Sequence, residues 1–452
     1  MSRSAAGAAG LFLSSCFGER VSTTPTPRPT FGRVPDRIDT RWPIKHVVYL
    51  MLENRSFDNL FGRFNGARGT SVGVRWGRET PLVRCPEWLP GDLAHSLDAW
   101  ETSFNGGRMD GFAIGDYGPH FAYSQFAPSD IPNYWHWAKQ NVLCDNFFAS
   151  VAGPSYPNHL FFVAGQAGGA IDNPENIQTK RFNDGRVFKS WGCDAFGDGV
   201  FVYVADADGT IREHGTCFDF RTIGEQLSAR DIDWASYSAD PYQAGYIWQP
   251  YSAIRAVYEN EEFWDEHIWP VDDLLRDIDA ATLPSVTWVT PRFQLSDHPP
   301  FSTKHAHNWV TDIVNAIMLS DLWESVAIFI TWDEWGGLYD HVLPPEIDRV
   351  QLGFRVPMLV ISPYAKRGYV DDAFAEFSAP LRFIADNWDL PYLTGRIRRS
   401  HSFEHVFDFR GAPRPPDPRP HVKATNDFWD WPEEFRGWPV HLDPEAPAIR
   451  YP

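Results

Sequence analysis

Carboxylate and amide side chains follow two apolar runs of the sequence, as Glu53-Asn54 in one place and as Asp333-Glu334 in another. The oxygen atoms of these groups are the ligands that hard divalent cations prefer. Each pair alone is a weak signal, because acidic residues often end strands as ordinary loop residues. Together they predict one metal site, provided that the two runs are parallel strands whose carboxyl ends meet at one edge of a sheet. Such oxygen ligands suit Ca²⁺, Mg²⁺ or Mn²⁺ and do not exclude Zn²⁺.

Ser155 is a candidate nucleophile. It is framed by prolines and precedes an apolar helical run, LFFVAGQ. A serine at a helix N-terminus faces backbone N–H groups and the positive end of the helix dipole, which attract an anion. A metal bound to its oxygen would make it a stronger nucleophile. The alternative is a serine that only caps the helix, and the segment alone favours that interpretation.

Three histidines are candidates for contact with a phosphoryl group. His298 lies in the loop SDHPP, where it could protonate a leaving alcohol, or simply bond to Asp297. His95 and His159 are further candidates on weaker grounds. The remaining histidines of interest are assigned surface or structural positions: His305, His307 and His341.

Two further features adjoin the acidic pairs. Arg55 is a candidate substrate-binding residue that could pair a phosphate, with an ion pair to Asp58 or another acid as the alternative. Gly336 and Gly337 follow the second pair and would let the backbone approach a ligand closely.

The elements that must position these residues follow an alternating pattern. Near-continuous apolar runs predict strands buried on both faces at 45–52, 285–290, 326–331 and 356–362. Apolar residues at helical spacing predict helices over about 304–322, around Ile223 and Leu227, and over 381–388. This order predicts an α/β fold, a mostly parallel sheet between two helix layers. A hairpin with an Asp-Gly turn interrupts it at 201–214.

The segments outside this pattern also have predicted places. Residues 60–135 are rich in Gly, Pro and Trp, and we expect loops and short helices that cap the site end of the sheet. Residues 41–452 then form one domain, and its Pro-rich stretch 411–452 wraps the surface. Residues 17–40 are a Pro/Thr-rich linker.

Composition limits the class of protein. The chain has 452 residues, 43% of them hydrophobic, so it is long and apolar enough to fold around a large core. Its net charge of -19 argues against a nucleic-acid partner, because phosphate backbones require basic surfaces. The 20 Trp, 33 Phe and 16 Tyr predict a core of large side chains, with a cleft of aromatic faces for a lipid, a choline-like cation or a sugar as the alternative.

The cysteines and the N-terminus bear on localisation. Cys193 and Cys217 flank the hairpin and could form a disulfide, with buried free thiols as the alternative. Residues 1–16, MSRSAAGAAGLFLSSC, are similar to the end of a bacterial lipoprotein signal in which Cys16 would carry the lipid. This predicts an exported protein, surface-anchored or secreted. A disordered tail on a cytoplasmic protein is the alternative.

Six segments together resemble the bacterial phosphoesterase family of phosphatidylcholine-type phospholipases C and a respiratory-burst-inhibiting acid phosphatase, within the alkaline phosphatase-like superfamily. They are 46–62, 105–112, 144–161, 296–300, 331–342 and 353–370. The pieces ENRSFD and DEWGG-YDHV are the most specific. The resemblance implies a three-layer α/β/α sandwich of the alkaline phosphatase type.

The resemblance also implies roles for individual residues. Glu53, Asn54, Asp333 and Glu334 match metal ligands, together with Ser155, which matches the nucleophile. His298 and, less closely, His95 match histidines that contact the phosphate. Trp335 departs from the family pattern and could narrow the cleft.

The implied function is hydrolysis of phosphate esters through a phosphoserine, with a divalent ion as cofactor and a phospholipid as substrate. A small phosphomonoester is the alternative substrate, favoured by serine at the nucleophile position and by the lack of the extra C-terminal β-domains of long phospholipases. A sulfate or phosphonate hydrolase and a non-catalytic surface lipoprotein are further alternatives.

Overall fold

An eight-stranded sheet lies at the centre of the protein. The computed structural model describes residues 39–89, 91–114, 119–183, 186–348 and 350–424. The strands lie in the order β13-β12-β14-β1-β15-β16-β6-β17. In that order they span Ile268–Pro270, Trp234–Ser238, Val286–Val289, His46–Leu52, Val326–Trp332, Met358–Ile361, Val142–Cys144 and Tyr369–Asp371. Only the two pairings of β16 are antiparallel, which confirms a mostly parallel sheet.

The four predicted strands correspond to β1, β14, β15 and β16. Every residue of these strands is buried, as expected for strands covered on both faces. Because β1 lies between β14 and β15 and pairs with both in parallel, the segments that follow these three strands emerge at the same edge of the sheet.

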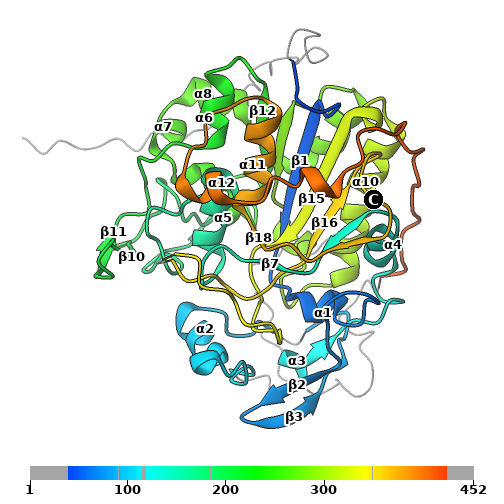
Figure 1. Cartoon of the computed structure of the whole chain (residues 1–452). Coiled ribbons are helices and arrows are strands. Elements are labelled where there is room, and N and C mark those ends of the chain that lie inside the picture. The colour runs from blue at the N-terminus through cyan, green and yellow to red at the C-terminus, as the bar shows by residue number, and fades with distance from the viewer. Residues whose placement is uncertain (1–38, 90, 115–118, 184–185, 349, 425–452) are drawn as a thin grey trace, which may run out of the picture.

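Helices cover both faces of the sheet (Figure 1). One group consists of α4 (Pro132–Gln140), α9 (Leu274–Asp279) and α10 (Thr303–Leu319). The other consists of α5 (Ser155–Ala164), α6 (Ile223–Ser228), α11 (Ser378–Asn387) and α12 (Gly395–Arg399), next to α7 (Arg255–Tyr258) and α8 (Glu261–His267). The three helices predicted from periodicity are therefore present as α10, α6 and α11, and the layered α/β architecture is confirmed.

Short elements gather at the pole to which the carboxyl ends of β1 and β15 point (Figure 1). They are α1 (Phe57–Phe61), β2 (Val72–Arg75), β3 (Arg78–Pro81), α2 (Leu97–Phe104) and α3 (Pro119–Ala122). Except for α1, which begins at Phe57, they lie within residues 60–135.

The Pro-rich segment after residue 411 runs along α10. The side chain of Asn315 donates to the carbonyl of Arg419, and that of Asn308 donates to the carbonyl of Val422. These contacts hold the segment on α10, and residues 425–452 of the predicted wrap lie outside the described part of the chain. None of the described helices combines the length and apolarity that crossing a bilayer requires.

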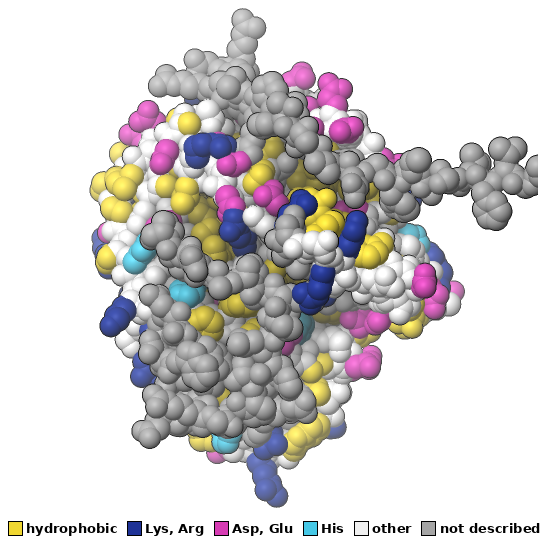
Figure 2. Space-filling model, turned by 180° about the vertical axis from the view of Figure 1, so that it is seen from behind, with side chains coloured by type: hydrophobic (Ala, Val, Ile, Leu, Met, Phe, Trp, Pro, Cys, Tyr) yellow, Lys and Arg dark blue, Asp and Glu magenta, His cyan; other side chains and the backbone are white. Residues whose placement is uncertain are grey.

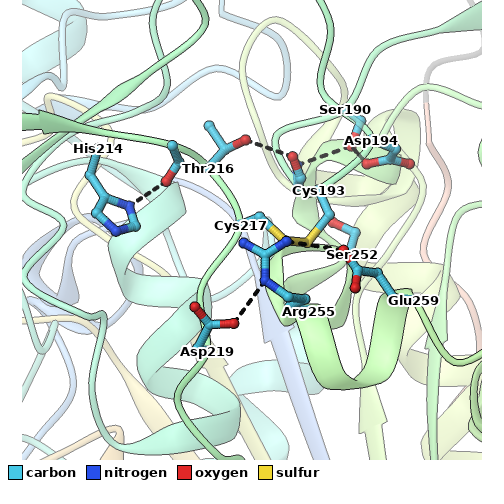
Figure 3. The surroundings of a disulfide bond; sticks show 12 residues. Ser190, Cys193, Asp194, His214, Thr216, Cys217, Asp219, Ser252, Arg255 and Glu259 are labelled. Carbon is cyan, nitrogen blue, oxygen red and sulfur yellow. Dashed lines mark hydrogen bonds and ion pairs between the residues drawn. A yellow bond between two sulfur atoms is a disulfide. The ribbon is translucent and has the colours of Figure 1, made fainter. Parts of the chain in front are cut away.

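A disulfide joins Cys193 to Cys217 beside the hairpin of β10 (Val202–Ala205) and β11 (Ile211–His214). Figure 3 shows it with the exposed Arg255, which pairs with Asp219 at 2.8 Å. Of the two alternatives left open for these cysteines, the disulfide is the one present. Cys85 and Cys144 are free and buried, and the predicted lipid-bearing Cys16 lies outside the described residues.

Candidate active site

The two acidic pairs meet at one edge of the sheet. Leu52 and Trp332, the last residues of β1 and β15, are register partners. The residues that follow the two strands therefore lie side by side. The backbone N–H of Asn54 donates to Oδ1 of Asp333 at 2.8 Å. Glu53, Asn54, Asp333 and Glu334 are all completely buried. The structure therefore brings the four predicted ligands together.

A tight backbone contact holds the two loops against each other. Asn54 and Gly336 both have left-handed backbone conformations, with φ of 61° and 62°. A Cβ at Gly336 would lie 2.5 Å from the carbonyl oxygen of Asn54. The close approach expected of this glycine is thus to the Asn54 backbone rather than to a ligand. Trp335 is completely buried and packs edge to face on Phe354.

Ser155 points at the acidic cluster. It is the first residue of α5, with Pro154 as the N-cap and no side-chain capping bond. Its Oγ instead donates to Oε2 of Glu53 at 3.3 Å. The capping interpretation is therefore wrong for this serine, since its hydroxyl faces the candidate ligands at a helix N-terminus.

Three oxygen atoms of this cluster lack a partner. Oδ1 of Asn54, Oδ2 of Asp333 and Oε1 of Glu334 are buried and accept no hydrogen bond from any described residue. A buried acceptor without a partner costs about 1–3 kcal/mol, and native proteins rarely contain several together. A divalent cation is a partner that such oxygens accept. The residues present thus fit a metal ion.

The carboxyl groups are electrostatically unfavourable without a cation. Burial, reinforced by Asp333 and Glu334, raises the pKa of Glu53 well above its usual range. Burial and Asp333 likewise raise the pKa of Glu334, and His95 acts in the opposite direction. The chain therefore gathers carboxyl groups in a dry site, where a bound cation would stabilise their charged forms.

His95 and His298 lie together beside the acidic cluster. Their rings meet edge to face with centroids 5.7 Å apart, and Nδ1 of each contacts a backbone carbonyl, that of Leu93 for His95 and that of Pro299 for His298. The amide of Asn54 lies 3.4 Å from Nε2 of His95. The structure thus brings both predicted histidines to the site.

Asp92 was not predicted from the sequence. Its carboxylate lies 3.5 Å from His95 and 3.9 Å from His298, and its side chain is 45% exposed. Burial acts to lower the pKa of His95, but Asp92 and Glu334 outweigh it and raise that pKa to about 9. Burial lowers the pKa of His298. The imidazole of His95 therefore favours the charged form, and that of His298 favours the neutral form.

His159 contacts the acidic cluster, and Arg55 follows Asn54 in the same loop. Nε2 of His159 is 2.8 Å from Oε1 of Glu53, and burial lowers the pKa of this histidine to about 4. Ligand atoms of Glu53, His159 and Asp333 lie within 4.8 Å of one another. Arg55, expected to contact substrate, is completely buried and donates to the carbonyl of Asp297 and the hydroxyl of Thr303.

A buried ion-pair group lies next to the site. Arg355 pairs with Asp58 at 3.2 Å and with Asp340 at 3.1 Å, and all three side chains are completely buried. His341 also contacts Asp58, at 2.6 Å. This group joins α1 to the loop after β15. Asp58 thus pairs with Arg355 rather than with Arg55.

The other histidines have structural positions. The backbone N–H of Asn133 donates to Nε2 of His307, which is completely buried. His305 is also buried and packs edge to face on Trp88. Their assignment as structural residues agrees with these contacts.

A sequence profile described as the phosphoesterase family matches residues 44–391. The chain belongs to this family. That assignment confirms the resemblance of the six segments, and the match includes Glu53, Ser155, Asp333 and both site histidines.

Named relatives are phospholipases C. The hemolytic phospholipase C of Pseudomonas aeruginosa is 27% identical over 83% of this chain and 57% of its own length. Phospholipase C B of Mycobacterium tuberculosis is 27% identical over 83% of this chain and 80% of its own length. Non-specific phospholipase C6 of Arabidopsis thaliana is 26% identical over 82% of this chain and 74% of its own length. The chain thus spans little more than half of the Pseudomonas protein.

Solved structures show a more distant likeness. A protein of the alkaline phosphatase superfamily from Vibrio parahaemolyticus matches with a TM-score of 0.35 and 12% identity, over 86% of this chain and 77% of that one. Murine ectonucleotide pyrophosphatase/phosphodiesterase 5 matches with a TM-score of 0.38 and 10% identity, over 80% of this chain and all of that one.

Proposed function

We propose that the protein is a metal-dependent phosphoesterase of phospholipase C type, which hydrolyses phosphate esters through a phosphoserine at Ser155. The observation that carries the proposal is the hydrogen bond from Ser155 to Glu53 inside a buried group of oxygen ligands. A nucleophile, a helix N-terminus and a cation site at one point are what phosphoryl transfer requires.

The residues have distinct tasks in this reaction. Glu53, Asn54, Asp333 and Glu334 would hold the cation, which when bound would polarise the Ser155 hydroxyl and a phosphoryl oxygen. Ser155 Oγ attacks phosphorus in line while its proton leaves toward Oε2 of Glu53, the acceptor of its hydrogen bond. The leaving alcohol departs from the opposite side of the phosphorus.

The groups around the phosphate complete the cycle. The first turn of α5 directs backbone N–H groups at the equatorial oxygens. His95 and His298 donate to a phosphoryl oxygen or to the leaving alcohol. Water then attacks the phosphoserine from the position that the alcohol vacated, and it returns the serine hydroxyl and a phosphate or phospho-alcohol.

The relatives favour a phospholipid substrate over a small phosphomonoester, because each is named a phospholipase C. An exported location remains part of the proposal. It is supported by the disulfide between Cys193 and Cys217, since such bonds persist in oxidising compartments, and by the lipoprotein-like residues 1–16.

A hydrolysis panel tests the proposal. Wild type and Ser155→Ala are assayed with p-nitrophenyl phosphate, p-nitrophenyl phosphorylcholine and phosphatidylcholine, before and after chelation and metal return. We expect turnover of the phosphorylcholine substrates, lost on chelation and in Ser155→Ala. Turnover of p-nitrophenyl phosphate alone would show an acid phosphatase rather than a phospholipase C. Metal-independent turnover, or turnover by Ser155→Ala, would contradict the mechanism.

A further inference from the structure

The turn between β2 and β3 has an unusual residue at its tip. Arg75 and Arg78 are register partners, so Trp76 and Gly77 form the two-residue turn. Both have positive φ, 46° and 76°, which is the type I′ pattern that Asn-Gly normally adopts. A large aromatic residue is disfavoured in this conformation. A residue kept in a disfavoured conformation points to a function of its side chain.

The same hairpin exposes an apolar side. Trp76 is 55% exposed, and Val72 and Val74 are 45% and 36% exposed. Alternation along a strand puts the two valines on one face and Gly73 on the other. Gly73 presses on aromatic rings, since a Cβ there would lie 2.9 Å from Tyr339. The hairpin therefore has one packed face and one face open to solvent, on which Val72 and Val74 lie opposite Pro81 and Glu79 of β3.

The packed face fixes the hairpin to the site. The backbone N–H of Val74 donates to the hydroxyl of Tyr339 at 3.2 Å, and Tyr339 belongs to the loop that carries Asp333 and Glu334. Asp110 accepts from the backbone N–H groups of Trp76 and Gly77, both at 2.9 Å. Figure 1 shows the hairpin at the pole to which the carboxyl ends of β1 and β15 point.

The hairpin region is basic in an acidic protein. Residues 62–84 contain five arginines and a single acidic residue, Glu79, whereas the whole chain has a net charge of -19. Arg78 is exposed and forms no ion pair with any described residue, whereas Nε of Arg75 is buried. Figure 2, the view from behind, shows basic side chains projecting at this pole with apolar ones nearby. Exposed Trp next to exposed Arg is typical of proteins that lie at a membrane surface.

We propose that the β2–β3 hairpin docks the protein on a lipid surface that carries anionic headgroups. Trp76, Val72 and Val74 enter the interface, while the exposed Arg78 faces headgroup phosphates. The inference deepens and rests on the proposed function, because docking at this pole would present phospholipids to the site.

A second hairpin of the same protein provides a matched comparison. Tyr203 and Ile211 on the β10–β11 hairpin are 38% and 57% exposed. Residues 205–213 there contain Asp206, Asp208 and Glu213 against one basic residue, Arg212. Apolar exposure is thus similar, but the charge is opposite, and Figure 1 shows that hairpin far from the β2–β3 pole. It should not bind anionic lipid.

The test measures binding apart from catalysis. Full-length proteins are sedimented with vesicles of phosphatidylcholine alone or with phosphatidylglycerol, in a Ser155→Ala background that prevents hydrolysis. All carry Cys16→Ser, so that no attached lipid contributes. The variants are Trp76→Asn, which suits the turn better than the native residue, Arg78→Gln, and Ile211→Asn as the control. With Ser155 restored, turnover of the same vesicles and of soluble p-nitrophenyl phosphorylcholine is then compared.

We expect Trp76→Asn to lower partitioning onto the mixed vesicles at least about ten-fold and Arg78→Gln about five-fold, with Ile211→Asn unchanged. Vesicle turnover should fall in parallel, and soluble turnover should stay constant. Unchanged sedimentation of Trp76→Asn, or an equal loss in Ile211→Asn, would overturn the docking proposal. Hairpin-dependent sedimentation without hydrolysis of any substrate by wild type would support docking and contradict the phosphoesterase function.

Discussion

The backbone N–H of Asn54 donates a 2.8 Å hydrogen bond to Oδ1 of Asp333, although 279 residues separate the two in the sequence. The bond ties the loop after β1 to the loop after β15. Because Oδ1 is occupied, only Oδ2 of Asp333 remains open, and it is one of the three buried oxygens without a described partner. The hydrogen bond therefore orients the Asp333 carboxylate before a cation arrives.

Metal binding should release protons. Glu53 and Glu334 have pKa values raised by burial and by neighbouring carboxylates, so the metal-free site retains protons that a cation must displace. Affinity for Mn²⁺ or Ca²⁺ should rise with pH, and Asp333→Asn should weaken it at least about ten-fold. Calorimetric titration in buffers of different ionisation enthalpy measures the metal affinity and the number of protons released. Tight binding that is independent of pH, with no proton released, would contradict this view of the site.

Arg355→Met should be strongly destabilising. The substitution leaves Asp58 and Asp340 buried without their guanidinium partner, which costs about 3–5 kcal/mol. The matched control is Arg255→Met, whose ion pairs with Asp219 and Glu259 are exposed and should contribute little to stability. Urea denaturation measures both free energies of unfolding.

The stability that Arg355→Met loses should also depend on pH. Burial already raises the pKa of Asp340 to about 6 with Arg355 present. Without the guanidinium this pKa rises further, so the folded variant binds more protons than the unfolded chain and regains stability as pH falls. The defect should be smaller at pH 5 than at pH 8. Equal defects at both would show that the two carboxylates are not the cause.

His267 should make folding sensitive to acid. Burial lowers its pKa to about 4, from an unfolded value of 6.5. Between these values the unfolded chain binds a proton that the folded protein does not, so stability falls as pH drops from 6.5 toward 4, by up to about 3 kcal/mol. The stability advantage of wild type over His267→Gln should shrink over that range. A constant difference between wild type and His267→Gln would contradict the prediction.

The sequence predicted correctly the place of candidate ligands that directly follow regular strands. Glu53-Asn54 and Asp333-Glu334 directly follow buried parallel strands, so strand order alone brings them to one edge. Ser155 was ambiguous, because the segment does not reveal that Pro154 takes the N-cap position and frees the hydroxyl.

Other contacts could not be predicted from sequence. Asp92 lies in an irregular loop where no periodicity indicates its direction, yet it reaches His95 and His298. Arg55 resembled a phosphate ligand by its place next to Asn54, and only the packing of the loop with Asp297 shows that it is buried. Such positions depend on tertiary contacts between distant loops rather than on local pattern.

Direct detection of the phosphorylated enzyme is the most decisive measurement. Protein quenched in acid during turnover of p-nitrophenyl phosphorylcholine is digested, and its peptides are identified by mass spectrometry. The account predicts one phosphorylcholine group on the peptide that contains Ser155, absent after chelation and absent in Ser155→Ala, which should be at least about 1,000-fold less active. A phosphorylcholine group on another residue, or full activity in Ser155→Ala, would contradict it.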